Sequence, residues 1–135
     1  MKLILTMFFI VTMALASSAM AQAPKAGDKE TGLAAVYSDV MDGHVTASGQ
    51  LYDKSKLTAA HKTLPFGTKI KVTNTKNNRS VVLRVNDRGP VQAGRILDIS
   101  PAAAARLRIS SKVMREVTLE VVEVGSGKTT RQPAH

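Results

Sequence analysis

Alternation between apolar and polar residues in two distant segments constrains the fold of this chain more than any other feature. In residues 68–74 and again in residues 117–124, alternate side chains are apolar, at Ile70, Val72, Val117, Leu119 and Val121. A two-residue period places successive side chains on opposite faces of a β-strand, so that one face can turn toward a core. Both segments are therefore predicted to be half-buried strands.

Three shorter segments extend this mainly β pattern. Residues 80–85 are rich in β-branched and apolar side chains and follow the turn residues Thr75–Asn78. They are predicted to pair back onto residues 68–74 as a hairpin. Residues 32–38 and 95–99 are two further short apolar segments, so we expect a domain built mainly from short strands.

One short helix is predicted after the segment that ends at Ile99. Ser100 is a suitable N-cap, Pro101 fits the first helical position, and Ala102–Leu107 follow. The run of alanines in this segment suits close packing on a sheet. Several short strands with one small helix favour a closed barrel, because closure removes exposed sheet edges.

The first residues are typical of a secretory signal peptide. Lys2 is followed by an apolar run of 14 residues, Leu3–Ala16, and then by small residues that end in an A-x-A cleavage pattern at Ala21. A membrane anchor is the alternative, but the run is shorter than the roughly 18 apolar residues that span a bilayer. We expect residues 1–21 to be removed near Ala21 and the mature chain to be periplasmic or secreted.

Composition divides the remainder into three parts. Residues 22–30 are typical of a flexible lead-in and residues 126–135 of a disordered tail, which leaves one folded domain at residues 31–125. The chain contains no cysteine, so we expect no lipid anchor and no disulfides, and the core must carry the fold. The domain is expected to be a monomer.

The basic charge of the chain predicts an anionic partner. Loss of Lys2 with the signal peptide lowers the net charge from +9 to +8. Cell wall, an anionic membrane surface and nucleic acid are the candidates. No nucleic-acid partner is expected, because the protein is exported and has only two Tyr, three Phe and no Trp to stack on bases. The alternative is that the Lys and Arg side chains only solvate the strand faces.

Two residues stand out as candidates for chemistry. Asp87 follows the strand at 80–85 and precedes Arg88-Gly89-Pro90, so its carboxyl is presented at a strand end, where functional groups are often held. The alternative is a turn-forming residue whose carboxylate bonds nearby backbone N–H groups. His61 precedes the turn at Pro65-Phe66-Gly67, and its alternative is a structural histidine that bonds backbone.

The chain lacks the sequence motifs that are typical of several other kinds of active site. The chain has no cysteine, no H-E-x-x-H and no pair of histidines at ligand spacing, so no metal and no cofactor are predicted. A G-x-S-x-G motif is also absent, which argues against a serine hydrolase.

Four motifs together carry a resemblance to a known family. They are Thr-Ala-Ser-Gly at 46–49, Leu-Thr-Ala-Ala-His-Lys-Thr-Leu-Pro-Phe-Gly-Thr at 57–68, Arg-Val-Asn-Asp-Arg-Gly-Pro at 84–90 and Gly-Arg-Ile-Leu-Asp-Ile-Ser at 94–100. Over about residues 32–124 the chain resembles the rare lipoprotein A family, the septal-ring lytic transglycosylases of bacteria. The resemblance implies a six-stranded double-psi β-barrel with one or two short helices. It also implies cleavage of peptidoglycan strands between N-acetylmuramic acid and N-acetylglucosamine, which leaves a 1,6-anhydro ring.

The same resemblance assigns roles to matching residues. Asp87 and His61 fall on the family's catalytic acid and histidine, and Gln50 stands where the family usually has a glutamate. An amide can hold a sugar hydroxyl but cannot exchange protons. The predicted substrate-binding residues are Gln50, Tyr52, Asp53, Arg88 and Asp98. Asp98 is also the second candidate for the acid, or else a residue that starts the helix or closes the barrel. Typical members carry a lipid-anchored cysteine and many carry a repeat domain; this chain is expected to be barrel-only.

Lytic transglycosylation can use a single acid because the attacking hydroxyl belongs to the sugar itself. The hypothesis is that Asp87 gives a proton to the glycosidic oxygen and then takes one from the 6-hydroxyl, while His61 bonds the acid or the sugar. Two other readings stay open. One is a non-catalytic, expansin-like module that binds peptidoglycan, which Gln50 favours. The other is an exported interaction protein that uses its basic surface.

Overall fold

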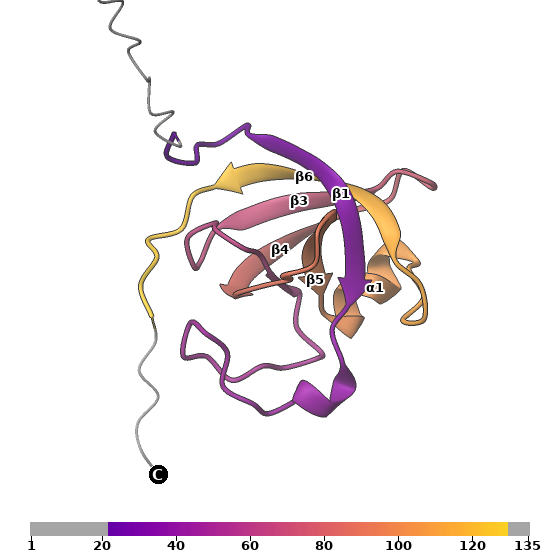
Figure 1. Ribbon diagram of the computed structural model, residues 1–135, viewed down its shortest axis with the longest axis horizontal. Helices are drawn as coiled ribbons and strands as arrows, with labels where there is room; N and C mark the ends of the chain where they lie inside the picture. The colour runs from indigo at the N-terminus through magenta and orange to yellow at the C-terminus, as the bar shows by residue number, and fades with distance from the viewer. Residues whose placement is uncertain (1–21, 130–135) are drawn as a thin grey trace, which may run out of the picture.

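The strands of the protein close into a barrel in the computed structural model, which describes residues 22–129 (Figure 1). The predicted signal peptide, residues 1–21, and residues 130–135 of the predicted tail lie outside the described residues. The elements in chain order are β1 (Lys29–Val36), a 3-10 turn η1 (Asp39–Met41), β2 (Thr58–Ala60), β3 (Lys69–Asn74), β4 (Ser80–Asp87), β5 (Arg95–Ile99), α1 (Pro101–Leu107) and β6 (Arg115–Glu123).

The order of strands around the barrel is β1-β5-β2-β4-β3-β6, and β6 returns to β1. The β1–β5 and β2–β4 pairs are parallel, and the other pairs are antiparallel. The predicted fold class, a mainly β, six-stranded double-psi barrel with a short helix, is confirmed. Within residues 22–129 no helix has the length and apolar character that a bilayer crossing requires.

Alternation in β3 and β6 builds the core as predicted. The alternate side chains named from the sequence are at most 2% exposed, at Ile70, Val72, Val117, Leu119 and Val121. Because β3 pairs with both β4 and β6, its buried face continues onto Leu83 and Val85 of β4. Burial of such side chains is worth about 1.5–3 kcal/mol each, so this wall carries much of the stability of a chain without disulfides.

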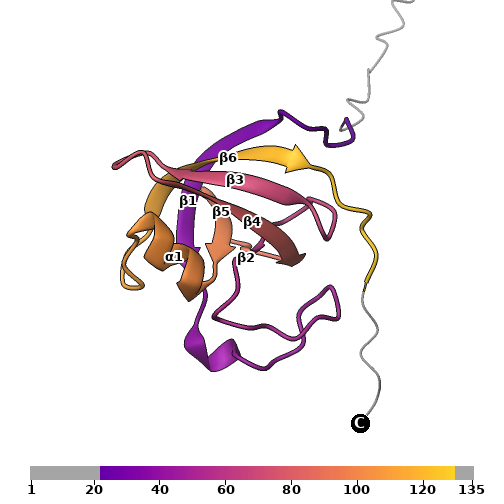
Figure 2. The same cartoon turned by 180° about the vertical axis from the view of Figure 1, so that it is seen from behind.

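The sequence pattern does not reveal β2. Its residues, Thr58–Ala60, are all buried, and a strand of this length is too short to display a period. It becomes a strand because it lies between β4 on one side and β5 on the other (Figure 2). This central position brings together the ends of β4 and β5, where the candidate acids lie.

The predicted helix forms with the predicted cap. The Oγ of Ser100 accepts a hydrogen bond from the N–H of Ala103 at 3.2 Å, and Pro101 is the first helical residue. The other end is satisfied from the β3–β4 hairpin, because Asn74 and Asn77 both donate to the carbonyl of Leu107 at 3.0 Å. The helix packs against β4 and so supports the strand that ends at Asp87.

The first strand begins before the predicted domain boundary, and backbone hydrogen bonds occur beyond the predicted boundaries at both ends. β1 begins at Lys29, within the predicted lead-in, and the backbone of Gly27 donates to the carbonyl of Val121 at 2.8 Å. At the other end, the N–H of Gly127, within the predicted tail, donates to the carbonyl of Phe66 at 3.0 Å. Backbone hydrogen bonds determine where the ordered structure begins and ends, and the composition of the sequence does not reveal these bonds.

Candidate active site

The two candidate acids lie in one row of the sheet. Ala60 of β2 pairs with Asp87 at the end of β4 and with Asp98 of β5. Ala60 has only a methyl group and is 1% exposed, so it leaves room beside it for both larger side chains. Both acids were predicted from the sequence. Their arrangement on either side of Ala60 was not, because it depends on the short strand β2.

The carboxyl group of Asp87 is 8% exposed and is held by donors from separate segments. Its Oδ2 accepts from the hydroxyl of Tyr37 at 2.5 Å, and its Oδ1 accepts from the N–H groups of Ala47 and Arg88 at 2.9 Å each. The backbone bonds foreseen as the alternative for Asp87 are therefore present, together with one side-chain partner. Among residues 22–129 no Lys, Arg or His side chain forms an ion pair with Asp87.

No motif in the sequence singles out Tyr37, the side-chain partner of Asp87. It directly follows β1, and its ring lies 4.6 Å from the ring of Tyr52, at an interplanar angle of 35°. Burial, and next the hydrogen bond to Asp87, hold the pKa of the Tyr37 hydroxyl well above its usual range. The only feature of the sequence that could have pointed to Tyr37 is its position near the end of a predicted strand.

His61 is 5% exposed, and both ring nitrogens are engaged away from the acid. Its Nδ1 lies 3.1 Å from the N–H groups of Thr63 and Leu64, and its Nε2 lies 3.0 Å from the carboxylate of Glu30. Because Nδ1 must accept these bonds, we assign the ring proton to Nε2. Of the two contacts predicted for the imidazole, with the acid or with the sugar, the contact with the acid is absent; only the backbone N–H of His61 reaches the Asp87 carbonyl, at 3.2 Å.

The side chain of Arg88 also turns to the loop that follows His61. Its Nη1 donates to the carbonyl of Leu64 at 2.7 Å, and its guanidinium carbon lies 4.0 Å from the centre of the Phe66 ring. These contacts fix the loop against the end of β4. The charge of Arg88 is therefore directed at carbonyl oxygens and an aromatic face, and only its backbone N–H meets the Asp87 carboxylate.

An open cavity of about 570 Å³, the Gln50 cavity, lies between β4 and the loop that precedes β2. It is lined by Gln50, Leu51, Asp53, Lys56, Thr58, Arg84 and Asn86. The side-chain hydroxyl of Ser55, and next its backbone N–H, lower the pKa of Asp53, whose carboxylate stays charged and exposed. Asn86 precedes Asp87 on β4, and Asp87 itself does not line this cavity.

Tyr52, also predicted to bind substrate, lies inside the protein. Its side chain is 4% exposed and lines neither the Gln50 cavity nor the two cavities beside the end of β1. Its hydroxyl has no hydrogen-bond partner among residues 22–129. Burial, and next the charges of three nearby aspartates, raise the pKa of Tyr52 to about 12.

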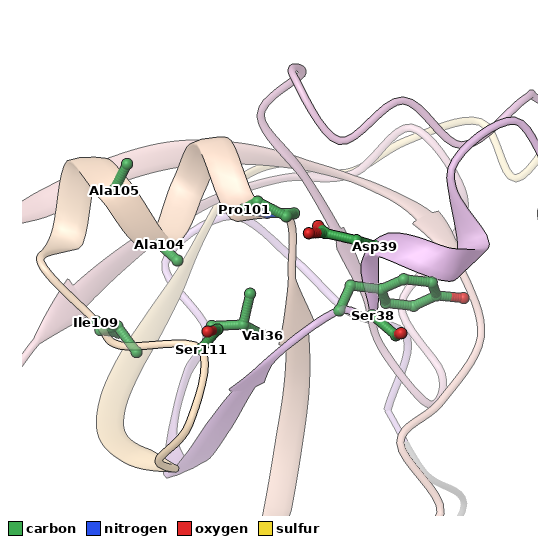
Figure 3. Close-up of a pocket in the computed structure, with 9 residues that line it drawn as sticks. Val36, Ser38, Asp39, Pro101, Ala104, Ala105, Ile109 and Ser111 are labelled. Atoms are coloured by element: carbon green, nitrogen blue, oxygen red, sulfur yellow. The ribbon is translucent and has the colours of Figure 1, made fainter.

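Two more cavities flank the end of β1. The Asp98 cavity, about 310 Å³, is lined by Val36, Tyr37, Ser38, Met41, Arg88, Arg95 and Asp98. Within it the Nε of Arg95 donates to Asp98 at 3.0 Å, and its Nη2 makes a second contact. The helix cavity, about 660 Å³, lies between α1 and the chain after β1 (Figure 3). Tyr37 lines both cavities, whereas Asp87 lines neither.

The described part of the chain has no obvious place for a metal ion. Among residues 22–129, His, Asp and Glu side chains form no group of three or more that could hold one.

Comparison with known proteins gives consistent matches over the barrel. The family described as lytic transglycolase matches residues 29–121. The endolytic peptidoglycan transglycosylase RlpA of Vibrio cholerae is 47% identical over 98 residues, which are 73% of this chain and 37% of that protein. RlpA of Campylobacter jejuni is 42% identical over 109 residues, 81% of this chain and 40% of its own length. The chain thus spans well under half the length of these curated relatives.

Two solved structures share the fold. The Streptomyces papain inhibitor superposes with a TM-score of 0.58 at 24% identity, over 76% of this chain and 100% of the inhibitor. An expansin from Clavibacter michiganensis superposes with a TM-score of 0.56 at 20% identity, over 73% of this chain and 52% of the expansin. At these identities the likeness establishes the fold alone.

Proposed function

The chain belongs to the lytic transglycolase family, and from that premise we propose that it cleaves peptidoglycan strands as an endolytic transglycosylase. The named activity of the Vibrio and Campylobacter relatives and a family match over nearly the whole barrel support this function. The proposed place of action is the cell wall outside the cytoplasm, periplasmic or secreted, after removal of residues 1–21. The protein acts there as a monomer without cofactor, and its partner is the glycan strand.

The proposed reaction breaks the bond between C1 of N-acetylmuramic acid and the oxygen of the next N-acetylglucosamine. Asp87 in its protonated form gives its proton to that oxygen as the C1–O bond breaks. The 6-hydroxyl of the same muramic acid then bonds to C1, and its proton returns to the Asp87 carboxylate. The products are a 1,6-anhydro end and a free 4-hydroxyl, no water is consumed, and the acid is regenerated.

The surroundings of the two acids carry this assignment. Asp87 is buried, is held by a tyrosine and two backbone N–H groups, and has no cation paired with it among the described residues. Asp98 is paired with the guanidinium of Arg95. The Arg95 guanidinium occupies the carboxylate of Asp98, whereas Oδ2 of Asp87 accepts a single bond, from the Tyr37 hydroxyl. Asp87 is therefore the proposed acid and Asp98 the partner of Arg95 beside the substrate.

The cavities supply the proposed binding surface. Gln50 and Asp53, on the Gln50 cavity, are placed to hydrogen-bond sugar hydroxyls and acetamido groups. His61 and Arg88 serve this site through the loop at 61–66, which both of them fix by bonds to its backbone. Tyr52 contributes indirectly, because its ring packs against the ring of Tyr37.

The product of digestion tests the proposal. Residues 22–135 are incubated with purified glycan strands, and 1,6-anhydro ends are measured by mass spectrometry. We expect such ends from the wild type and none above background from Asp87→Asn, which preserves size and loses the proton. Hydrolysed, non-anhydro ends, or equal product from Asp87→Asn, contradict the proposed reaction.

The second candidate function is a non-catalytic module that binds peptidoglycan. The observation that favours it is Gln50, because an amide at this position of the Gln50 cavity can bind a sugar but cannot transfer a proton. Sedimentation with whole sacculi separates the two. Binding without any anhydro product, in wild type and in Asp87→Asn alike, supports the module.

A further inference from the structure

The two oxygens of Asp87 have unequal surroundings. Oδ1 accepts two backbone N–H bonds, from Ala47 and Arg88, whereas Oδ2 accepts a single bond, from the Tyr37 hydroxyl. An oxygen that already accepts two donors has little capacity left for a substrate. Oδ2 is therefore the oxygen that can meet a glycosidic linkage, and Tyr37 is the side chain that fixes where it lies.

Tyr37 is also the connection between this buried acid and open space. Asp87 lines neither cavity beside β1, but Tyr37 lines both the Asp98 cavity and the helix cavity. Its own position is well determined. Its backbone N–H donates to the carbonyl of Ile99 at 2.8 Å, and its ring rests on Tyr52 at 4.6 Å. Of the two hydrogen-bonded side chains, Tyr37 is therefore the one exposed to these cavities.

We propose that Tyr37 is a positioning residue for the transglycosylase reaction: it holds Oδ2 of Asp87 for proton transfer and donates a hydrogen bond to the carboxylate once the proton has left. The inference rests on the proposed function. In the first step the proton passes from Asp87 to the glycosidic oxygen, and charge appears on the carboxylate. In the second step the 6-hydroxyl returns a proton, and the charge disappears. Tyr37 keeps its own proton throughout.

The chemistry of the phenol suits this task. Burial, the hydrogen bond to Asp87 and the nearby charges of Asp87 and Asp98 keep the pKa of Tyr37 well above its usual range. At neutral pH the hydroxyl is therefore a donor and never a competing base. A donor aimed in advance at an atom that becomes charged during a reaction lowers the barrier, because it needs no rearrangement.

The test compares Tyr37→Phe with the wild type across pH, using the release of anhydro ends. The phenylalanine keeps the ring on Tyr52 and removes only the hydroxyl. We expect kcat to fall roughly 10- to 100-fold, a part of what general acid–base catalysis contributes, with KM changed less than about twofold. The pH profile of kcat should change as well, because the Tyr37 hydroxyl contacts the carboxyl group that transfers the proton. An unchanged kcat and pH profile overturns the proposal.

A matched control separates positioning from loss of stability. Thr75→Val also removes one hydroxyl, which contacts Glu116 at the β3–β4 hairpin, away from the acids. Both variants are checked for the same thermal midpoint before the rates are compared. We expect Thr75→Val to keep the wild-type kcat and pH profile. If the two variants lose kcat equally, Tyr37 has only a structural role and the proposal is wrong.

A second measurement needs no substrate. The chain has two tyrosines, so the ionisation of Tyr37 can be followed by ultraviolet absorbance in a Tyr52→Phe background. Adding Asp87→Asn should bring the ionisation of Tyr37 to lower pH, and adding Asp98→Asn should do so less, because Asp87 has the larger effect on this hydroxyl. No shift overturns the contact and the inference with it. A clear shift in a protein that releases no anhydro ends instead locates the failure in the proposed function.

Discussion

The surroundings of Asp87 and of Asp98 differ although the two residues flank the same alanine. Asp98 is bonded to Arg95, three positions earlier on its own strand. Asp87 is bonded to Tyr37 and Ala47, which are 50 and 40 positions away in sequence. The Asp98 pair joins two residues of one strand, whereas the Asp87 site joins segments that are far apart in the sequence.

The charges of the two partners differ as well. Arg95 brings a full positive charge to Asp98, and the two side chains form an ion pair. The Tyr37 hydroxyl and the backbone N–H groups bring only dipoles to Asp87. When two carboxyl groups in one site have such different neighbours, they are suited to different tasks. On this basis we propose proton transfer for Asp87 and a structural or binding task for Asp98.

The largest expected effect is the difference between two matched substitutions. We expect Asp87→Asn to lower the rate of anhydro-end release by at least about 100-fold, which corresponds to roughly 3 kcal/mol of activation free energy. Asp98→Asn keeps two hydrogen-bonding atoms beside Arg95 and should cost less than about tenfold. Both rates are measured on the same glycan strands at saturating substrate. A larger loss from Asp98→Asn reverses the assignment of the two acids.

His61 offers the next largest effect, because its ring supports the loop behind Asp87. His61→Ala leaves the N–H groups of Thr63 and Leu64 without their acceptor, which should lower the free energy of unfolding by about 2 kcal/mol. His61→Asn offers an amide oxygen to the same donors and should lose less than half as much. Urea denaturation measures both.

Activity then shows which task His61 performs. If it only supports the loop, folded His61→Asn keeps its rate within about tenfold of the wild type. A stable His61→Asn protein that is as inactive as Asp87→Asn would show that the imidazole itself takes part in the proton transfer, and would extend the Asp87 site to a second residue.

Gln50→Glu gives the third effect, a gain. The substitution adds a carboxyl group to the Gln50 cavity, where the family resemblance expects one. We expect the rate of anhydro-end release to rise by about tenfold, or roughly 1.4 kcal/mol. Leu51→Glu, which adds a carboxylate at another position on the same cavity, serves as the control for the added negative charge. An unchanged or lower rate in Gln50→Glu means that the amide already meets the needs of the site.

The walls of the barrel were largely predictable from local pattern, and the contacts of the site were not. The period of two in β3 and β6 and the cap at Ser100 act over a few residues, so they can be read along the chain. The family resemblance named Asp87. It could not supply the bond from Tyr37 or that from Ala47, because each joins segments that only the closed barrel brings together. Glu30 was missed as the partner of His61 for the same reason.

The smallest effect is expected at Tyr52, whose ring packs against the ring of Tyr37. Its hydroxyl is buried without a partner among the described residues, so Tyr52→Phe removes an unsatisfied polar group and keeps the ring contact. We expect the free energy of unfolding at pH 7 to stay the same or to rise by up to about 1 kcal/mol. If urea denaturation instead shows a lower free energy of unfolding for Tyr52→Phe, the Tyr52 hydroxyl has a hydrogen-bonding partner.

Alkaline pH sharpens this last prediction. Burial raises the pKa of Tyr52 to about 12 in the folded protein, above the value of about 10 in an unfolded chain. The folded state therefore holds this proton more tightly, and the stability that follows is complete below about pH 10 and is lost as the pH rises toward about 12. One such proton changes the free energy of unfolding by at most about 1.4 kcal/mol per pH unit. Tyr52→Phe should lose stability less steeply than the wild type over this range, and the remaining slope then includes the contribution of Tyr37, the hydroxyl that holds Asp87.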